Sequence, residues 1–354
     1  MGRPRVAVAM SGGVDSSVSA ALLQEAGYDV LGVSLQLWCE ERHSISSHPT
    51  CCSYQDINDA RMVCHLLDVP FYIINAEEPF QSYVVDYFCQ EYARGRTPNP
   101  CIACNQKIKF DLLLNRVLSL GAEYLATGHY ARIENRGKAY RLLKGVDTSS
   151  DQSYFLYTLG QQELPHLLFP VGGYLKAEVR RMAAERGLSV ADKPKSQDLC
   201  FVPGGNCADF IRDHLPSATG EIVDTEGRVL GWHRGIAFYT VGQRTGLGLA
   251  TGRRLYVLSI DATNNRVTVG PEDKLLVSVL RTTSARFVNE RPWQPEAVKA
   301  KIRHRSPETD AVLYPGEDGV IVQFLTPQRA VTPGQAVVFY QGDEVMGGGI
   351  IEAS

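Results

Sequence analysis

The chain has 354 residues and a formal net charge of −3, with 44% hydrophobic and 21% charged residues. Because a single hydrophobic core seldom grows beyond about 250–300 residues, this length predicts two or three domains. The composition is an ordinary globular balance. The slightly acidic charge excludes a protein that is basic throughout, so any nucleic-acid contact must come from local patches.

No run approaches the roughly 18 apolar residues that a membrane-spanning helix needs. The start, Met1 to Arg5, leads into a strand-like run without an apolar signal region. We therefore expect a cytoplasmic enzyme with no membrane partner. Nine cysteines, an odd number, in a chain without signs of secretion argue against a disulfide framework. Metal ligands, reactive thiols and buried thiols are better interpretations.

The first 130 residues alternate short apolar runs with helical patterns. We expect strands at 6–10, 30–35, 71–74 and 124–127, helices at 16–26, 56–67 and 110–120, and an amphipathic stretch around 79–92. Such alternation predicts a parallel sheet covered by helices on both faces. A hairpin is expected over 130–143, and helical patterns return at 161–168 and 176–186.

The texture changes after about residue 203, where glycine-rich turns and β-branched residues dominate. From about residue 276 the segments are short and strand-like, which is typical of a small β-barrel. We therefore predict an α/β fold with three parts: a parallel-sheet domain over 1–202, a small mixed central domain over 203–275, and a C-terminal β-barrel over 276–354.

The strongest local signal is the loop Ser11-Gly12-Gly13-Val14-Asp15-Ser16-Ser17, between a buried strand and a helix. Its glycines let the backbone pass close to an anion, and the amides of the helix N-terminus can hold a phosphate. Asp15 can hold the Mg²⁺ that accompanies a leaving pyrophosphate. A Walker A loop would need a lysine, which is missing here, and the dinucleotide fingerprint is also absent.

Two cysteine segments carry a second signal. Cys101 and Cys104 follow a stiff segment with Pro98 and Pro100, and Cys200 lies in Ser196-Gln-Asp-Leu-Cys200. Cys104 is expected near a helix N-terminus, where the helix dipole lowers a thiol pKa and favours the thiolate. Sulfur transfer needs such thiols, because one cysteine can carry a persulfide while a second resolves it or releases sulfide.

The phosphate loop resembles that of the ATP pyrophosphatases, which adenylate a carbonyl oxygen and release pyrophosphate. Further motifs in this order resemble the tRNA-specific 2-thiouridylase family over essentially the whole chain: Asn99-Pro100, Cys104-Asn105, Thr127-Gly-His-Tyr130, Asp151-Gln-Ser-Tyr154, Ser196-Gln-Asp198, Tyr239-Thr-Val-Gly-Gln-Arg244 and Pro333-Gly-Gln335. The resemblance implies ATP-dependent conversion of a tRNA uridine, the wobble U34, to 2-thiouridine. It makes residues 1–202 the catalytic domain and 203–275 a tRNA-binding domain.

The resemblance also implies roles for individual residues. Cys104 would be the nucleophile and Cys200 the persulfide carrier, with sulfur supplied by a cysteine desulfurase or a sulfur-relay protein. The expected ATP contacts are Ala9, Met10, Ser11, Gly12, Gly13, Val14, Asp15, Ser16, Leu35 and Gly128. The expected tRNA contacts are Asn99, Pro100, Cys101, His129, Ser150, Asp151, Gln152, Arg303, His304 and Gln335.

Three positions depart from the family pattern. Cys101 stands where many members have Asp, Ser150 where Lys is common, and Leu35 where Met is usual. Cys101 opens a second mechanism, because Cys101, Cys104 and Cys200 together can hold a [4Fe–4S] cluster with one open iron for a sulfide. Zinc is a further possibility, since Cys-x-x-Cys is common in zinc sites. Persulfide and cluster mechanisms stand as alternatives.

A basic stretch over 299–305 is a candidate tRNA surface. In a strand, Lys299, Lys301, Arg303 and Arg305 would share one face and form a cationic row along the phosphates. Two other function classes stay open. One is a small-molecule adenylating ligase similar to GMP synthetase, and the other is a non-catalytic tRNA-binding or metal-storage module.

Overall fold

The computed structural model describes residues 2–37, 54–194, 199–202, 205–317 and 319–353. The chain divides into two compact units, and each is described by itself. Unit 1 comprises residues 1–85, 101–205 and 343–345, and unit 2 comprises 86–100, 206–342 and 346–354. Among the described residues, no helix is both long and apolar enough to cross a membrane.

Unit 1 is built on a parallel five-stranded sheet with the order β3-β2-β1-β4-β7. The strands are β1 (Arg5–Ala9), β2 (Asp29–Gln36), β3 (Phe71–Asn75), β4 (Tyr124–Ala126) and β7 (Leu167–Leu168). Val6, Ala7 and Val8 of β1 and Leu125 and Ala126 of β4 are fully buried, as expected of strands covered on both faces. The first four predicted strands are confirmed.

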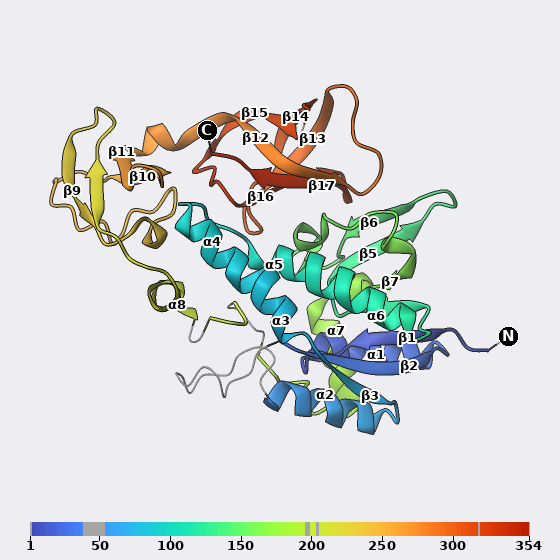
Figure 1. The fold of residues 1–354 in the computed structure, drawn as a ribbon. Coiled ribbons are helices and arrows are strands. Elements are labelled where there is room, and N and C mark those ends of the chain that lie inside the picture. Colours follow the sequence, from blue (N-terminus) through green and yellow to red (C-terminus); the bar gives the residue numbers. More distant parts are fainter. Residues whose placement is uncertain (1, 38–53, 195–198, 203–204, 318, 354) are drawn as a thin grey trace. The chain divides into compact units, whose positions relative to one another are not determined.

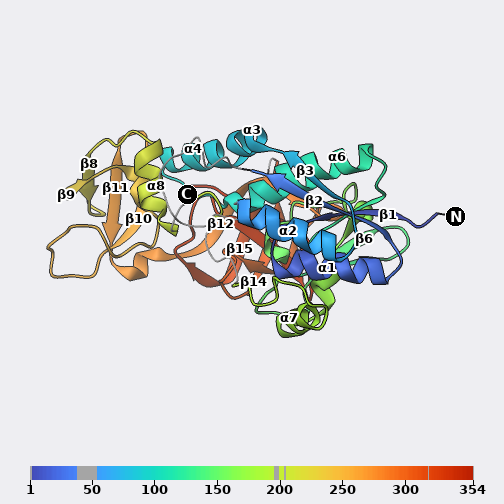
Figure 2. The same cartoon turned by 90° about the horizontal axis from the view of Figure 1, so that it is seen from below.

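Helices cover both faces of this sheet (Figure 2). On one side lie α1 (Val14–Glu25), α2 (Tyr54–Leu66) and α7 (Lys176–Glu185), whose apolar residues share a core with β1 and β2. On the other side lie α3 (Glu77–Phe80) and α6 (Leu114–Ser119). The π-helix η2 (Gln81–Asp86) follows α3, while α5 (Pro100–Ala103) and the π-helix η3 (Cys104–Leu113) precede α6.

The helix expected over 161–168 is wrong. That segment contains a single 3₁₀ turn, η5 (Leu164–His166), and then the edge strand β7. Pro165 is tolerated in the first turn of η5, but in the interior of the predicted helix it would remove a backbone hydrogen bond, and Leu167 instead pairs with Leu125 of β4. The 3₁₀ turns η4 (Ser153–Leu156) and η6 (Pro170–Gly173) flank this region. The expected hairpin is confirmed as β5 (Ala131–Asn135) and β6 (Tyr140–Lys144).

The central part of unit 2 contains a four-stranded mixed sheet with the order β10-β11-β8-β9. Its strands are β8 (Gly220–Val223), β9 (Val229–His233), β10 (Tyr256–Asp261) and β11 (Arg266–Gly270). The helices of this unit are α4 (Tyr87–Ala93) and α8 (Cys207–His214), with the 3₁₀ turns η8 (Ile236–Phe238) and η9 (Glu272–Leu275). The small mixed domain predicted here is confirmed.

A six-stranded antiparallel barrel forms the C-terminal part (Figure 1). Its strands are β12 (Leu276–Phe287), β13 (Glu296–Lys301), β14 (Thr309–Pro315), β15 (Val320–Arg329), β16 (Ala336–Gln341) and β17 (Glu344–Ile351). Pairing of β12 with both β15 and β17 closes it. Closure leaves no free strand edge, which stabilises a short all-β segment.

Core packing in β4 generates a stability prediction. Leu125 is fully buried in the middle of the parallel sheet, whereas Leu120 at the end of α6 is 64% exposed. Leu125→Ala should lower the free energy of unfolding of unit 1 by about 2–5 kcal/mol, because it removes buried methyl groups and leaves a cavity. Urea unfolding followed by circular dichroism measures this loss, with Leu120→Ala as the matched control. Equal losses in both variants would contradict the packing described here.

Candidate active site

The phosphate loop connects β1 to α1 at the carboxyl edge of the sheet. Ser16 Oγ accepts a hydrogen bond from the Ser11 amide (3.2 Å) and lies 3.1 Å from the Gly13 carbonyl, to which it donates. Gly13 is the N-cap of α1, and no side chain caps this helix. The first amides of α1 therefore stay available to an anion, as phosphate binding at a helix N-terminus requires.

Two glycines allow the backbone contacts of this loop. Gly12 has a φ of +68°, and a Cβ there would lie 2.2 Å from the Asp56 carbonyl oxygen. Gly128 follows β4, and its Cβ would lie 2.7 Å from the Ser16 amide nitrogen. The sheet order reverses between β1 and β4, which is the position where doubly wound sheets bind ligands. The residues expected to contact ATP at 9–16 and at Gly128 therefore come together there.

Asp15 is held by two side chains from distant parts of the chain. Lys176 Nζ lies 2.5 Å and 2.7 Å from its two carboxylate oxygens, and the Tyr130 hydroxyl donates to it at 2.8 Å. Burial and the neighbouring Asp15 carboxylate raise the pKa of Tyr130, so its hydroxyl stays protonated and remains a donor. The loop carboxylate is thus fixed in place and its charge is balanced.

A second lysine reaches the loop from the other side. Lys193 Nζ donates to the Gly12 carbonyl at 2.9 Å and to the carboxylates of Asp56 and Asp59, each at 2.6 Å. Partial burial opposes the lysine charge, but the hydrogen bonds that Lys193 donates to the two carboxylates outweigh it and raise the pKa of Lys193. Asp56 and Asp59 therefore position a cation at the phosphate loop.

The sequence interpretation did not single out Lys176 or Lys193. They stand 161 residues from Asp15 and 181 residues from Gly12 along the chain, so no local pattern connects them to the loop. The feature of the sequence that could have indicated them is their position, at the start of α7 and after its end. That helix packs in the same core as α1.

His129 is buried beside the loop after β4. It is 8% exposed, its Nδ1 lies 2.7 Å from the Thr127 hydroxyl, and its ring packs between Phe110 and Phe169. Burial, with a contribution from Lys109, lowers the pKa of His129 well below its ordinary value. The imidazole is therefore neutral at physiological pH and is one of the buried side chains of unit 1.

The three candidate cysteines differ in accessibility: Cys101 is exposed, Cys200 is half-buried and Cys104 is buried. Cys104 lies one turn into the helix that begins at Pro100. Burial raises the pKa of the Cys104 thiol, and Lys109 offsets this only in part. The depressed pKa expected from the helix dipole is therefore wrong for this conformation, because desolvation of the thiolate outweighs the dipole.

The described parts of the chain contain no group of three or more His, Cys, Asp or Glu side chains that could hold a metal ion. Cys101, Cys104 and Cys200 are thus not gathered as the ligands of a [4Fe–4S] cluster or of zinc. Of the other cysteines, Cys64 is fully buried, while Cys89 and Cys207 are half-buried. Cys39, Cys51, Cys52, His43, His48 and the motif 196–198 lie outside the described residues.

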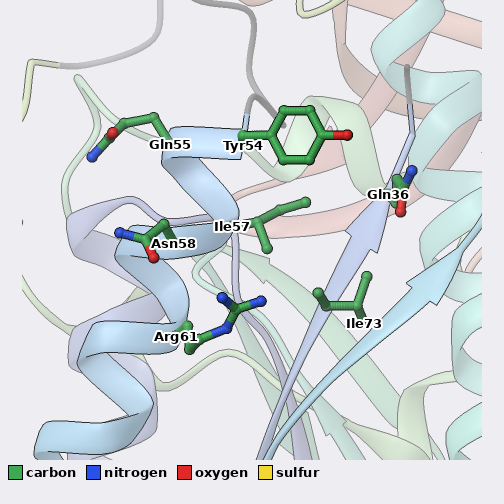
Figure 3. Close-up of a pocket in the computed structure, with 7 residues that line it drawn as sticks. All are labelled: Gln36, Tyr54, Gln55, Ile57, Asn58, Arg61 and Ile73. Atoms are coloured by element: carbon green, nitrogen blue, oxygen red, sulfur yellow. The ribbon is translucent and has the colours of Figure 1, made fainter. Parts of the chain in front are cut away.

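A pocket of about 420 Å³ opens at the same carboxyl edge of the sheet (Figure 3). It lies between α2 and the ends of β2 and β3, with Tyr54 and Ile57 pointing from the helix toward β2. The lining residues are Gln36, Tyr54, Gln55, Ile57, Asn58, Arg61 and Ile73. Gln36 directly follows Leu35, the residue expected at the adenine, but successive residues of a strand point to opposite faces of the sheet, and Leu35 does not line this pocket.

Some of the residues expected to contact tRNA in unit 1 make hydrogen bonds within the protein. The Asp151 carboxylate accepts hydrogen bonds from the amides of Gly145 and Ser153. Gln152 pairs with Tyr130 through its backbone amide (2.9 Å) and its side-chain oxygen (3.0 Å). Ser150 is buried at 7% exposure. This turn is therefore held rigidly beside β5.

In unit 2 the cationic row is shorter than expected, because β13 ends at Lys301. Lys299 is exposed and pairs with Asp310, while the intervening Ala300 is buried. Arg303 and His304 lie in the following turn and are half-buried. A single strand face carrying Lys299 to Arg305 is therefore wrong.

An uncapped phosphate loop at the reversal point of a doubly wound sheet, with no Walker lysine, defines an α/β nucleotide-binding protein of the pyrophosphatase-loop class. Three family descriptions match consecutive parts of the chain: "tRNA methyl transferase HUP domain" over 4–204, "tRNA methyl transferase PRC-barrel domain" over 208–271 and "Aminomethyltransferase beta-barrel domain" over 277–351. Together with the relatives described next, they show that the chain belongs to the tRNA-specific 2-thiouridylase (MnmA) family.

Two relatives illustrate the similarity. The tRNA-specific 2-thiouridylase MnmA of Roseiflexus sp. (strain RS-1) is 50% identical, over 98% of this chain and 99% of its own length. The MnmA 1 protein of Thermoanaerobacter sp. (strain X514) is 51% identical, over 98% of both chains. A solved 4-thiouridine synthetase–RNA complex with bound ATP is similar over 59% of the chain, at 17% identity and a TM-score of 0.36.

The close approach of Gly128 to the loop generates a binding prediction. Gly128→Ala places a methyl group 2.7 Å from the Ser16 amide nitrogen and 2.8 Å from Asp15 Cβ, so the loop must move. ATP affinity, measured by isothermal titration calorimetry, should fall about tenfold or more, corresponding to roughly 1.4 kcal/mol. Gly173→Ala is the matched control, because nothing lies within 4 Å of its Cβ. Unchanged ATP affinity in Gly128→Ala would place the nucleotide elsewhere.

Thiol burial generates a pH prediction. Since burial raises the pKa of Cys104, its alkylation by iodoacetamide should be slow at neutral pH and accelerate above pH 9, whereas exposed Cys101 reacts first. Peptide mass spectrometry resolves the two sites. Lys109→Gln removes the stabilising charge and should slow labelling of Cys104 further. Labelling of Cys104 as fast as that of Cys101 at pH 7 would contradict the buried position.

Proposed function

We propose that the chain is an ATP-dependent tRNA-uridine 2-sulfurtransferase that converts the wobble uridine to 2-thiouridine. The observation that carries the proposal is the uncapped N-terminus of α1 with Lys176 and Lys193 directed at its loop, in a chain that also contributes the Cys101–Cys104 helix. Family membership supports tRNA as the substrate. The first half of the reaction needs the loop, and the second half needs the cysteines.

In the adenylation half, the loop residues 9–16 bind the phosphates of ATP. Lys176 and Lys193 lie beside this loop, paired with Asp15 and with Asp56 and Asp59, and each would exchange a carboxylate partner for an oxygen of the leaving pyrophosphate. Hydrogen bonds to charged groups of this kind are worth about 1.5–3 kcal/mol each. Asp15 is the carboxylate that would hold Mg²⁺, which neutralises the phosphates when bound. The uridine O2 attacks the α-phosphorus, the bond to the β-phosphate oxygen breaks, and pyrophosphate leaves.

In the sulfur half, the terminal sulfur of a Cys200 persulfide attacks C2 of the adenylated base, and AMP leaves with the former O2. The Cys104 thiolate attacks Cys200 Sγ, which breaks the persulfide S–S bond and leaves 2-thiouridine with a Cys104–Cys200 disulfide. A dithiol reductant then restores both thiols. A cysteine desulfurase or a relay protein supplies the next sulfur. No step runs through a metal cluster, because the described cysteines are not gathered to hold one.

Within this scheme, desolvation of Cys104 prevents its premature reaction with the persulfide. A buried thiol with a raised pKa stays protonated and does not attack a persulfide before the base is in place. Formation of the thiolate then requires a change in the surroundings of Cys104 that lowers its pKa. In this scheme, binding of the tRNA and its activated base causes that change. We assign Cys101, which is exposed at the start of the same helix, to the position beside the base.

Replacement of the persulfide carrier tests the proposal. Cys200→Ser should lower 2-thiouridine formation by about 10³-fold while tRNA-dependent release of pyrophosphate persists, since only the second half, in which AMP leaves, needs the thiol. Mass spectrometry of digested tRNA and a pyrophosphate assay measure the two halves. Half-buried Cys89, with a pKa raised by burial, provides the matched control Cys89→Ser.

Two outcomes would contradict the proposal. Full thiolation by Cys200→Ser would remove the persulfide route. ATP turnover that proceeds without tRNA and accelerates with a small amide donor would instead identify an adenylating ligase similar to GMP synthetase.

A further inference from the structure

A turn of the barrel holds the segment that leads into the base-binding residues. The amide of Thr97 donates to the Pro333 carbonyl at 2.9 Å. Gln335 Nε2 donates to the carbonyl of Thr97 at 2.8 Å and to that of Pro98 at 3.3 Å. All these residues belong to unit 2. Because Pro98 and Pro100 have no amide hydrogen, the segment offers few donors of its own, and the turn supplies them.

The turn packs closely against the segment at Gly334. Gly334 has a φ of +89°, and a Cβ there would lie 2.9 Å from the Thr97 nitrogen. On its other side the turn is joined to the end of β17: the Gly334 amide donates to Ile351, and the Ile351 amide donates to Gln335. The barrel thus fixes the turn, and the turn fixes the segment.

The same turn is connected to a residue expected to contact RNA. The Arg303 guanidinium donates to the Ala330 carbonyl and, at 3.0 Å, to the Thr332 hydroxyl. Thr332 directly precedes Pro333. Hydrogen bonds, together with the peptide bond between Thr332 and Pro333, therefore connect Arg303 through the turn to Thr97 and Pro98, within one unit.

We propose that Gln335 is a positioning residue for the base-binding segment. Its side-chain amide has two donor hydrogens, and both are directed at backbone carbonyls of Thr97 and Pro98. Gln335 therefore acts on the reaction through the placement of Asn99 and Pro100, the residues expected at the target base. This inference rests on the proposed function, because it assigns Asn99 and Pro100 to the uridine.

The test uses two isosteric variants of the full-length protein. Gln335→Glu places a carboxylate against two carbonyl oxygens, and Gln335→Met removes the donors without adding a charge. Gln323→Glu on the exposed face of β15 is the matched control for charge. Thiolation at saturating tRNA should fall about tenfold or more in Gln335→Glu and less in Gln335→Met, while the Kd for tRNA changes by less than about threefold.

Limited proteolysis, which does not depend on catalysis, tests this inference independently of the proposed function. Trypsin cleaves after Arg96, directly before the held segment, so release of the segment should speed this cut in both Gln335 variants and not in Gln323→Glu. A weaker tRNA Kd with an unchanged maximal rate would make Gln335 an RNA contact and overturn the inference. Unchanged cleavage after Arg96 would also overturn it. If the wild-type protein showed no thiolation while cleavage after Arg96 was still faster in the Gln335 variants, the proposed function would be refuted. The positioning of the Thr97–Pro98 segment by Gln335 would remain supported.

Discussion

The close approach of two loops at the reversal point of the parallel sheet is the constraint on which the rest of the site depends. The loop after β1 and the loop after β4 meet with no space for a Cβ at Gly128. This contact places Tyr130 within 2.8 Å of the Asp15 carboxylate, and Lys176 completes the arrangement from α7. Because tightly packed backbone cannot yield, the anion-binding amides of α1 hold their direction without a ligand.

The sequence predicted most of what is local. Apolar runs and helical spacing identified β1 to β4, α1, α2 and α7, since each pattern is decided within a dozen residues. Ser11 to Ser17 was recognisable as a phosphate loop for the same reason. The two-residue strand β7 is too short to leave a pattern, so Leu167 was assigned to a helix.

What depended on tertiary packing could not be predicted. Lys193 reaches Gly12 across 181 residues, and no periodicity encodes that contact. The helix dipole at Cys104 is a local effect that lowers the thiol pKa, whereas burial of the thiol by the folded unit raises the pKa and is larger. Gln335 was recognised from its motif, but its hydrogen bonds to Thr97 and Pro98 appear only once the barrel is closed.

Several ionisable groups around the phosphate loop have pKa values shifted away from the neutral range. Tyr130 has a raised pKa, His129 a lowered one and Lys193 a raised one, while hydrogen bonds from Ser149 hold the pKa of Asp147 at about 2. Each of these four groups keeps one charge state across the neutral range. Inflections of the pH dependence of turnover near neutral pH therefore do not come from these four side chains.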